Sequence, residues 1–275
     1  MGYYVQADRG VKLYVEDVGT GVPVVFIHGW PVNHRMFEYQ VSQLPKYGYR
    51  CIQIDLRGFG RSDRPWTGYS YNRLADDIRS VIDALQLDRV RLAGFSVGGA
   101  VAIRYMSRHA GHKVAQPLLF GAASPVFTRR QDFPYGLSKE EVNALLIAGD
   151  QDRPLMLENF GKMFFAHKVS APFADWFRGL GLSASSHATS AVLISLRDED
   201  LRPDLPRIHT PTAIFHGALD RICPFPLAQL THQGIAGSTL TRFEQSGHGL
   251  FYDELAKFNR SFLEVLHSFR APGEP

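Results

Sequence analysis

The feature that most constrains the fold is the stretch Gly94-Phe95-Ser96-Val97-Gly98-Gly99, which follows an apolar run and opens a helical pattern. Glycines two residues before and two residues after a serine suit a very tight turn from a strand into a helix, because a Cβ at either position would collide. The serine must then adopt a strained backbone conformation. The pattern predicts a nucleophile elbow, with a flexible turn that has no catalytic meaning as the alternative.

Three further segments have the order that such an elbow requires. Residues 24–31 form an apolar run that ends in a His-Gly pair followed by Trp30. Residues 212–217 form a second apolar run, and Asp220 follows it. His248 lies between two glycines after a last predicted strand. The chain order is therefore serine, aspartate, histidine, each expected at the carboxyl end of a parallel strand, where open α/β sheets bind their ligands.

These residue types together predict a catalytic triad. Ser96 is the predicted nucleophile, His248 the base that takes its proton, and Asp220 the acid that orients the imidazole. The backbone N–H groups of Trp30 and Val97 are the predicted oxyanion donors. Asp55 also ends a predicted strand and is the alternative acid, but Asp220 matches the usual strand placement better.

The remaining histidines have weaker contexts. We expect His28 to organise the oxyanion loop, and His216, in a similar Phe-His-Gly context, to be structural as well. The others are expected at the surface or in packing: His34, His109, His112, His167, His187, His209, His232 and His267.

The order of apolar segments indicates an α/β fold. Residues 3–7 and 12–17 are expected to form an antiparallel edge pair with a turn at 8–10. Strands at 22–27, 50–55 and 90–95 alternate with helices at 34–46, at 70–86 and after Ser96, as parallel strands with right-handed crossovers do. A length of 275 residues with 45% apolar content suits one such domain with an insert.

The alternation stops between about residues 124 and 205, where we expect a helical cap. Amphipathic stretches lie near 139–149, 152–166, 171–180 and 185–197. Ser138 and Glu141 form a predicted capping box at the start of the first stretch. The predicted organisation is thus a core of residues 1–123 and 206–275 with a cap of residues 124–205.

Nearly the whole chain resembles the α/β-hydrolase superfamily, and within it the cofactor-free non-haem chloroperoxidase and aryl esterase group. The resemblance is carried by residues 26–30, 47–50, 55–68 and the Ser96 motif. It implies a mostly parallel, twisted sheet flanked by helices, with the inserted cap. It also implies a serine carboxylesterase that hydrolyses small apolar or aryl esters through an acyl-enzyme without a cofactor.

The same resemblance suggests the substrate site and a side activity. It places around the substrate the side chains of Phe127, Phe160, Phe164, Ile222 and Phe225. In the resembled group a carbonyl beside the oxyanion tryptophan can face the active site. Because Pro31 restricts the conformation of Trp30, this carbonyl could accept a hydrogen bond from peroxide and allow peracid formation.

Two alternatives remain open. The same triad could open a lactone or cleave an amide or a carbon–carbon bond, whereas a serine at the elbow argues against dehalogenase and epoxide hydrolase chemistry, which use aspartate there. Some proteins of this fold instead turn over slowly and act as ligand sensors, which fold alone does not distinguish.

Composition excludes several classes of partner. The net charge is +3, and Arg129-Arg130 is the only adjacent basic pair, so no nucleic-acid partner is expected. No apolar run reaches the ~18 residues of a membrane span, and no secretory signal is visible, so we expect a cytoplasmic protein.

Cys51 and Cys223 are expected to be buried and unpaired, and no metal site is expected. The expected partner is a small-molecule ester; association of several copies is left open.

Overall fold

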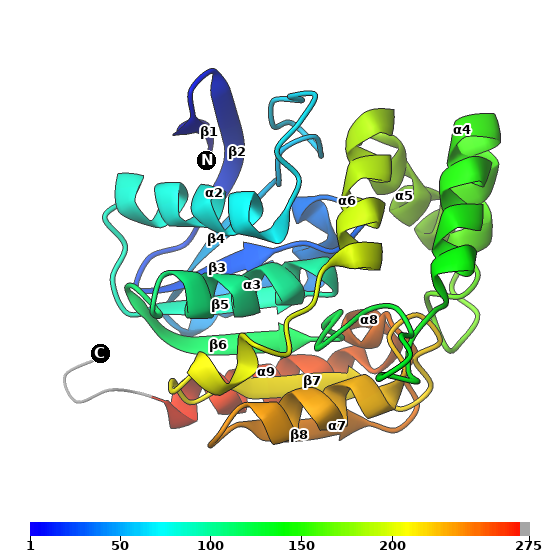
Figure 1. Cartoon of the computed structure of the whole chain (residues 1–275). Coiled ribbons are helices and arrows are strands. Elements are labelled where there is room, and N and C mark those ends of the chain that lie inside the picture. Colours follow the sequence, from blue (N-terminus) through cyan, green and yellow to red (C-terminus); the bar gives the residue numbers. More distant parts are fainter. Residues whose placement is uncertain (270–275) are drawn as a thin grey trace.

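An eight-stranded sheet forms the middle layer of the structure, a computed structural model in which residues 1–269 are described (Figure 1). The strand order is β1-β2-β4-β3-β5-β6-β7-β8. β2 is antiparallel to both of its neighbours, and all other adjacent strands are parallel. The strands are β1 (Gly2–Asp8), β2 (Val11–Val18), β3 (Val22–Ile27), β4 (Tyr49–Ile54), β5 (Val90–Phe95), β6 (Val114–Phe120), β7 (Ala213–Gly217) and β8 (Thr239–Phe243).

Helices cover both faces of the sheet. In Figure 1, α2, α3 and α7 lie in front of the strands and α9 lies behind them. The α-helices are α1 (Glu38–Val41), α2 (Tyr71–Ala84), α3 (Val97–Arg108), α4 (Lys139–Gly161), α5 (Ala171–Leu182), α6 (Ser186–Asp198), α7 (Phe225–Gly234), α8 (Leu250–Asp253) and α9 (Leu255–Ser268). Short 3-10 helices are η1 (His34–Phe37), η2 (Leu44–Tyr47) and η3 (Leu205–Arg207).

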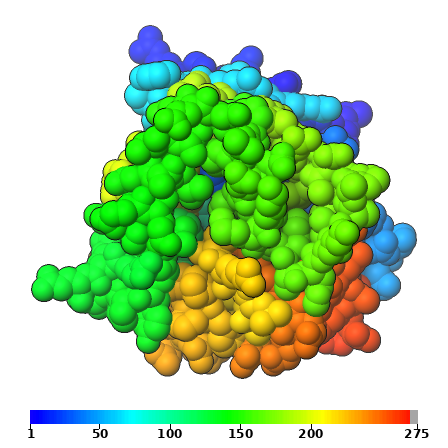
Figure 2. Space-filling model, turned by 90° about the vertical axis from the view of Figure 1, so that its right-hand side faces the viewer, coloured from blue at the N-terminus to red at the C-terminus, as the bar shows by residue number. Residues whose placement is uncertain are grey.

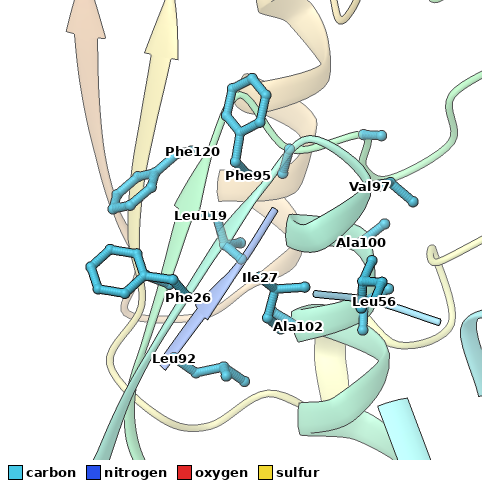
Figure 3. Close-up of a cluster of buried hydrophobic side chains, with 14 of the residues drawn as sticks. Phe26, Ile27, Leu56, Leu92, Phe95, Val97, Ala100, Ala102, Leu119 and Phe120 are labelled. Atoms are coloured by element: carbon cyan, nitrogen blue, oxygen red, sulfur yellow. The ribbon is translucent and has the colours of Figure 1, made fainter. Parts of the chain in front are cut away.

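The core consists of two apolar layers, one on each side of the sheet. Phe26 and Phe120 point to one side of the strands, whereas Ile27 and Ala102 lie on the side of α3 (Figure 3). On the first side, Phe262 of α9 packs edge-on against Phe120, with ring centroids 5.1 Å apart. Burial on both faces explains why the central strands are almost continuously apolar.

The structure confirms the predicted α/β fold and most of the strand and helix assignments. Two differences have local causes. The helix expected at 34–46 is three short pieces instead, and Pro45, which has no N–H to donate, is the second residue of the last of them. Strand β6 was not predicted: it carries Pro117 in its interior, a residue that argues against a central strand.

Three helices lie between β6 and β7, at the end of the sheet toward which the parallel strands point (Figure 1). The predicted capping box is confirmed, since Glu141 N–H donates to Ser138 Oγ at 3.0 Å and Ser138 N–H donates to the Glu141 carboxylate. The first two predicted stretches form one kinked helix, α4, with non-helical backbone at Asp152 and Pro154 just after it. Seen from this side, the green and yellow-green atoms of these helices cover the upper part of the molecule, and the surface is hollowed between them (Figure 2). The division at residues 124 and 205 stays a prediction.

The structure also bears on the predictions about disulfides, membrane spans and metal sites. Cys51 and Cys223 are buried and not joined to each other. Within residues 1–269, none of the helices combines the length and the apolar character that a bilayer crossing requires. In the same residues, no three His, Cys, Asp or Glu side chains come together in a way that could hold a metal ion.

Candidate active site

The turn between β5 and α3 has the geometry of a nucleophile elbow. Ser96 has φ 54° and ψ −118°, a conformation that side-chain-bearing residues rarely adopt. A Cβ at Gly94 would lie 2.3 Å from the carbonyl oxygen of Gly98, and a Cβ at Gly98 would lie 2.2 Å from that of Ile27. Glycine is therefore required on both sides of Ser96, and the predicted tight turn is confirmed.

The two predicted oxyanion donors flank this turn. Val97 is the first residue of α3, and Trp30 follows β3, the strand that pairs with β5. A Cβ built at Gly29 would lie 3.1 Å from Ser96 Cβ, so the two loops are in contact. In the part of the chain that the structure describes, neither the Trp30 N–H nor the Val97 N–H donates to another residue. Both groups therefore keep a free donor next to Ser96. The Trp30-Pro31 peptide bond is cis.

Asp220 and His248 form a buried hydrogen-bonded pair. His248 Nδ1 and Asp220 Oδ2 are 2.7 Å apart. The other carboxylate oxygen, Oδ1, accepts hydrogen bonds from the N–H groups of Ile222 and Cys223, each at 2.8 Å. These two backbone donors hold the carboxylate in one orientation, with Oδ2 directed at the imidazole of His248.

A second histidine also contacts this carboxylate. His216 Nε2 lies 2.6 Å from the carbonyl oxygen of Cys223 and 3.3 Å from Asp220 Oδ2. Burial by itself raises the pKa of the Asp220 carboxyl, but His248 and His216 outweigh it and hold that pKa below its ordinary value. Asp220 is therefore ionised at neutral pH and can stabilise a protonated His248.

The ring of His248 packs next to the elbow. His248 is only 1% exposed and packs on Phe95 and Phe164, with ring centroids 4.8 and 5.0 Å apart. Among residues 1–269, its Nε2 has no hydrogen-bond partner. The structure thus brings His248 next to the residue that precedes Ser96 but forms no Ser96–His248 hydrogen bond. In unliganded active sites such catalytic bonds are often long and tighten only with substrate.

The His248 loop is tied to the inserted helices, which the sequence did not indicate. Asp253 Oδ2 accepts hydrogen bonds from Gly247 N–H at 2.8 Å and from Ala166 N–H at 2.9 Å. Gly249 N–H donates to the carbonyl oxygen of Phe164, also at 2.8 Å. Burial raises the pKa of the Asp253 carboxyl. The position of His248 therefore depends on the segment between α4 and α5.

The alternative acid, Asp55, is engaged elsewhere. Its Oδ1 accepts hydrogen bonds from the backbone N–H of His34 and from His34 Nδ1, each at 2.8 Å. Its Oδ2 accepts the Arg61 N–H, also at 2.8 Å. His34, expected at the surface or in packing, is thus buried and paired. The structure pairs His248 with Asp220 and not with Asp55.

His28 braces the loop that carries Trp30. Its Nδ1 donates to the carbonyl oxygen of Gly29 at 2.9 Å, and its Nε2 accepts the N–H of Leu56 at 3.0 Å. Complete burial lowers the pKa of His28 to about 4, so the ring is neutral at neutral pH. A neutral ring is required, because only an unprotonated Nε2 can accept the Leu56 hydrogen bond.

This burial predicts a pH dependence of stability. The unfolded chain protonates His28 near pH 6.5, whereas the folded chain does so only near pH 4, so stability is present above this window and is lost as pH falls through it. Between about pH 7 and about pH 4.5, His28 should lower the free energy of unfolding by about 2 kcal/mol. A His28→Gln variant keeps an acceptor for Leu56 and should lack this contribution. Urea unfolding of both proteins at the two pH values measures it; equal losses would contradict the prediction.

Two of the predicted substrate residues lie against the catalytic groups. The Phe164 ring is fully buried and contacts the ring of His248. The Phe160 ring packs edge-on against the Trp30 indole, with centroids 4.8 Å apart. Both come from the end of α4 and the loop after it, so the inserted segment forms part of the wall around the site.

For the other three predicted substrate residues, no side-chain hydrogen bond or ring contact with Ser96 or His248 is found among residues 1–269. Phe127 is buried at the start of the insert. Ile222 is buried beside Asp220, to which its N–H donates. The Phe225 ring lies 4.8 Å from the guanidinium of Arg242, a half-exposed side chain of β8. The same ring lies 6.0 Å from the ring of His216, which contacts Asp220, and the role of Phe225 at the substrate stays a prediction.

A cavity of about 460 Å³ lies between α4 and α5. Phe160 and Pro31 form part of its lining, together with Phe165 and Phe177. A second cavity, of about 580 Å³, lies between the segment after α4 and the loop that carries Asp220. Neither of these two cavities is lined by Ser96 or His248.

Comparisons with known proteins agree with the fold. The family model described as "alpha/beta hydrolase fold" matches residues 22–255. The AB hydrolase superfamily protein YisY of Bacillus subtilis is 51% identical over 268 residues, which cover 98% of this chain and 100% of the relative. An esterase from Exiguobacterium antarcticum superposes with a TM-score of 0.96 at 50% identity, covering 97% of this chain and 100% of that one. A bromoperoxidase from Bacillus anthracis superposes with a TM-score of 0.94 at 34% identity, with the same coverage.

Proposed function

Because this chain belongs to the α/β-hydrolase family, in its esterase and non-haem chloroperoxidase group, we propose that it is a serine carboxylesterase acting on small apolar or aryl esters. One observation carries the proposal most strongly. An ionised, doubly anchored Asp220 holds a buried His248, whose second nitrogen is unpaired within residues 1–269 and whose ring packs on Phe95, the residue before the strained Ser96. This arrangement is what activation of a serine hydroxyl requires.

The proposed reaction has two halves. Ser96 Oγ attacks the ester carbonyl carbon while His248 Nε2 takes the hydroxyl proton, and Asp220 stabilises the imidazolium that forms. The tetrahedral oxyanion accepts hydrogen bonds from the N–H groups of Trp30 and Val97. His248 then protonates the leaving alcohol, which departs and leaves an acyl-enzyme. Water deprotonated by His248 attacks the acyl carbon and releases the carboxylic acid and free Ser96.

A substrate panel with a covalent probe tests this proposal. The panel comprises the ester p-nitrophenyl acetate, the lactone γ-butyrolactone and the anilide p-nitroacetanilide, and the probe is diethyl p-nitrophenyl phosphate. We expect steady turnover of the ester and a diethylphosphoryl adduct located on Ser96 by mass spectrometry. Faster turnover of the lactone would favour a lactonase instead, and faster turnover of the anilide would favour an amidase. A single-turnover burst without steady turnover would favour a ligand sensor, and an unlabelled Ser96 would contradict the proposed nucleophile.

We also propose peracid formation as a second activity, which the similarity to a bromoperoxidase favours. Hydrogen peroxide replaces water as the attacker of the acyl-enzyme, so that its oxygen bonds to the acyl carbon and the Ser96–acyl bond breaks. The products are a peracid and free enzyme, and the peracid oxidises halide away from the site. A carbonyl next to Pro31 would accept a hydrogen bond from the attacking peroxide.

Substitution of Pro31 tests this second activity. In Pro31→Leu we expect the ratio of peracid formation to ester hydrolysis to fall about five-fold, the effect of losing one hydrogen bond worth about 1 kcal/mol. The assay is bromination of monochlorodimedone with acetate, peroxide and bromide, beside hydrolysis of p-nitrophenyl acetate as the control. Equal ratios in wild type and variant would remove the proposed role of Pro31.

A further inference from the structure

The cavity between α4 and α5 shares lining residues with the loop that carries Trp30. Phe160 lines the cavity and also packs against the Trp30 indole at 4.8 Å. Pro31, the residue after Trp30, lines it as well, and a Cβ built at Gly181 of α5 would lie 3.2 Å from Pro31 Cγ. The inserted helices and the predicted oxyanion loop therefore share one wall of this cavity.

The reacting groups themselves have little open space around them. Ser96 is 4% exposed and His248 is 1% exposed. Any ester larger than the reacting carboxyl group must extend an arm into a neighbouring space. The cavity of about 460 Å³ is within the size range of small-molecule sites.

The chemistry of the lining favours an uncharged arm. The inner wall is apolar and partly aromatic, with Phe160, Phe165 and Phe177 among its residues. The acidic side chains of the lining are paired: Glu158 lies 3.4 Å from Lys162, and Asp175 lies 3.2 Å from Arg178. Lys168 also lines the cavity, and all of these charged side chains are substantially exposed, so solvent screens them and they contribute little to the selection of a charged arm.

We infer that this cavity binds the apolar arm of the ester substrate and makes the enzyme prefer an eight-carbon alkyl arm to a two-carbon one. The inference rests on the proposed esterase function and adds the substrate class. Phe160 forms the boundary that the arm passes to reach Trp30 and Ser96.

Two helix glycines provide a matched pair of variants. Gly161 lines the cavity at the end of α4, and a Cβ built there meets no atom within 4 Å. Gly179 of α5 also has free space within 4 Å but is not part of the lining. Gly161→Leu therefore adds a side chain at the cavity lining, and its Cβ meets no clash. Gly179→Leu makes the same chemical change in a helix outside it, with a similar gain in helix propensity.

Ester preference is the first measurement. The values of kcat/KM for ethyl acetate, octyl acetate and ethyl octanoate are obtained by pH-stat titration for wild type and both variants. We expect Gly161→Leu to lower kcat/KM for one of the two long esters about ten-fold or more, because the leucine excludes several methylenes. Ethyl acetate should stay within about two-fold, as should all three esters with Gly179→Leu. A loss with ethyl octanoate would place the acyl arm in the cavity, and a loss with octyl acetate would place the alcohol arm there. An unchanged preference in Gly161→Leu would overturn the inference.

Binding of octan-1-ol, measured by calorimetry, is independent of turnover. We expect its Kd to rise about ten-fold in Gly161→Leu and to be unchanged in Gly179→Leu. If no ester is hydrolysed but octanol binding still depends on residue 161, the cavity assignment stands and the esterase proposal fails. If octanol binds all three proteins equally, the cavity assignment fails. Should Gly161→Leu not fold, Ala174→Leu on the opposite wall replaces it.

Discussion

Replacing Ser96 with alanine is expected to lower kcat for p-nitrophenyl acetate by about 10⁶-fold, to a small residual rate. The expected loss is large because the proposed reaction passes through a covalent acyl-enzyme, and alanine has no oxygen with which to form it. His248 Nε2 would then have no hydroxyl to deprotonate, although both oxyanion donors would remain. Residual hydrolysis well above the uncatalysed rate is therefore expected from these donors alone.

Ser124→Ala is the matched control for this experiment. Ser124 is buried like Ser96, and its hydroxyl accepts a hydrogen bond from Thr231 Oγ1 at 3.1 Å, outside the proposed machinery. We expect its kcat within about three-fold of wild type, the effect of a small local change. Thermal unfolding followed by circular dichroism shows whether both variants fold. A folded Ser96→Ala variant with wild-type kcat would refute the serine mechanism.

Replacing Asp220 with asparagine is expected to lower kcat about 10⁴-fold while leaving the fold intact. Asparagine keeps one oxygen for the N–H groups of Ile222 and Cys223, which now donate to Asp220 Oδ1. Its amide nitrogen then faces His248 Nδ1 and donates to it. The imidazole proton moves to Nε2, so His248 can no longer accept the proton of Ser96.

Asp55→Asn separates this effect from the general cost of altering a buried aspartate. Asp55 is also buried at the end of a strand and also paired with a histidine, His34, at 2.8 Å. We expect it to lower kcat by no more than about ten-fold, since His34 has no part in the proposed reaction. The measurements are kcat and KM for p-nitrophenyl acetate in both variants. A larger loss in Asp55→Asn than in Asp220→Asn would support the alternative acid.

Local patterns were sufficient to predict most of the fold. The strand at 22–27 and the strand at 90–95 have the predicted bounds, because continuous apolar runs between turn residues define buried strands. The failures have the same local origin. No strand was predicted at β6, which carries Pro117 in its interior, and the helix expected over residues 34–46 is three short pieces, the last of which contains Pro45.

The candidate site could be predicted only as a set of residues. The spacing of glycines identified Ser96, and the order of strands identified Asp220 and His248. Nothing local indicated that Asp253 would join the His248 loop to Ala166, 87 positions away. The shape of the cavity beside Pro31 could not be predicted either, because it arises from segments that only the folded chain brings together.

The sequence by itself determined the strained turn at Ser96, since its steric demands involve only neighbouring residues and the adjoining strand. Only the tertiary structure decided how far burial lowers the pKa of His28 and where an ester arm would find room. Contact, exclusion of water and cavity shape are properties of packed segments, and packing depends on the whole assembly of the chain rather than on any one stretch of it.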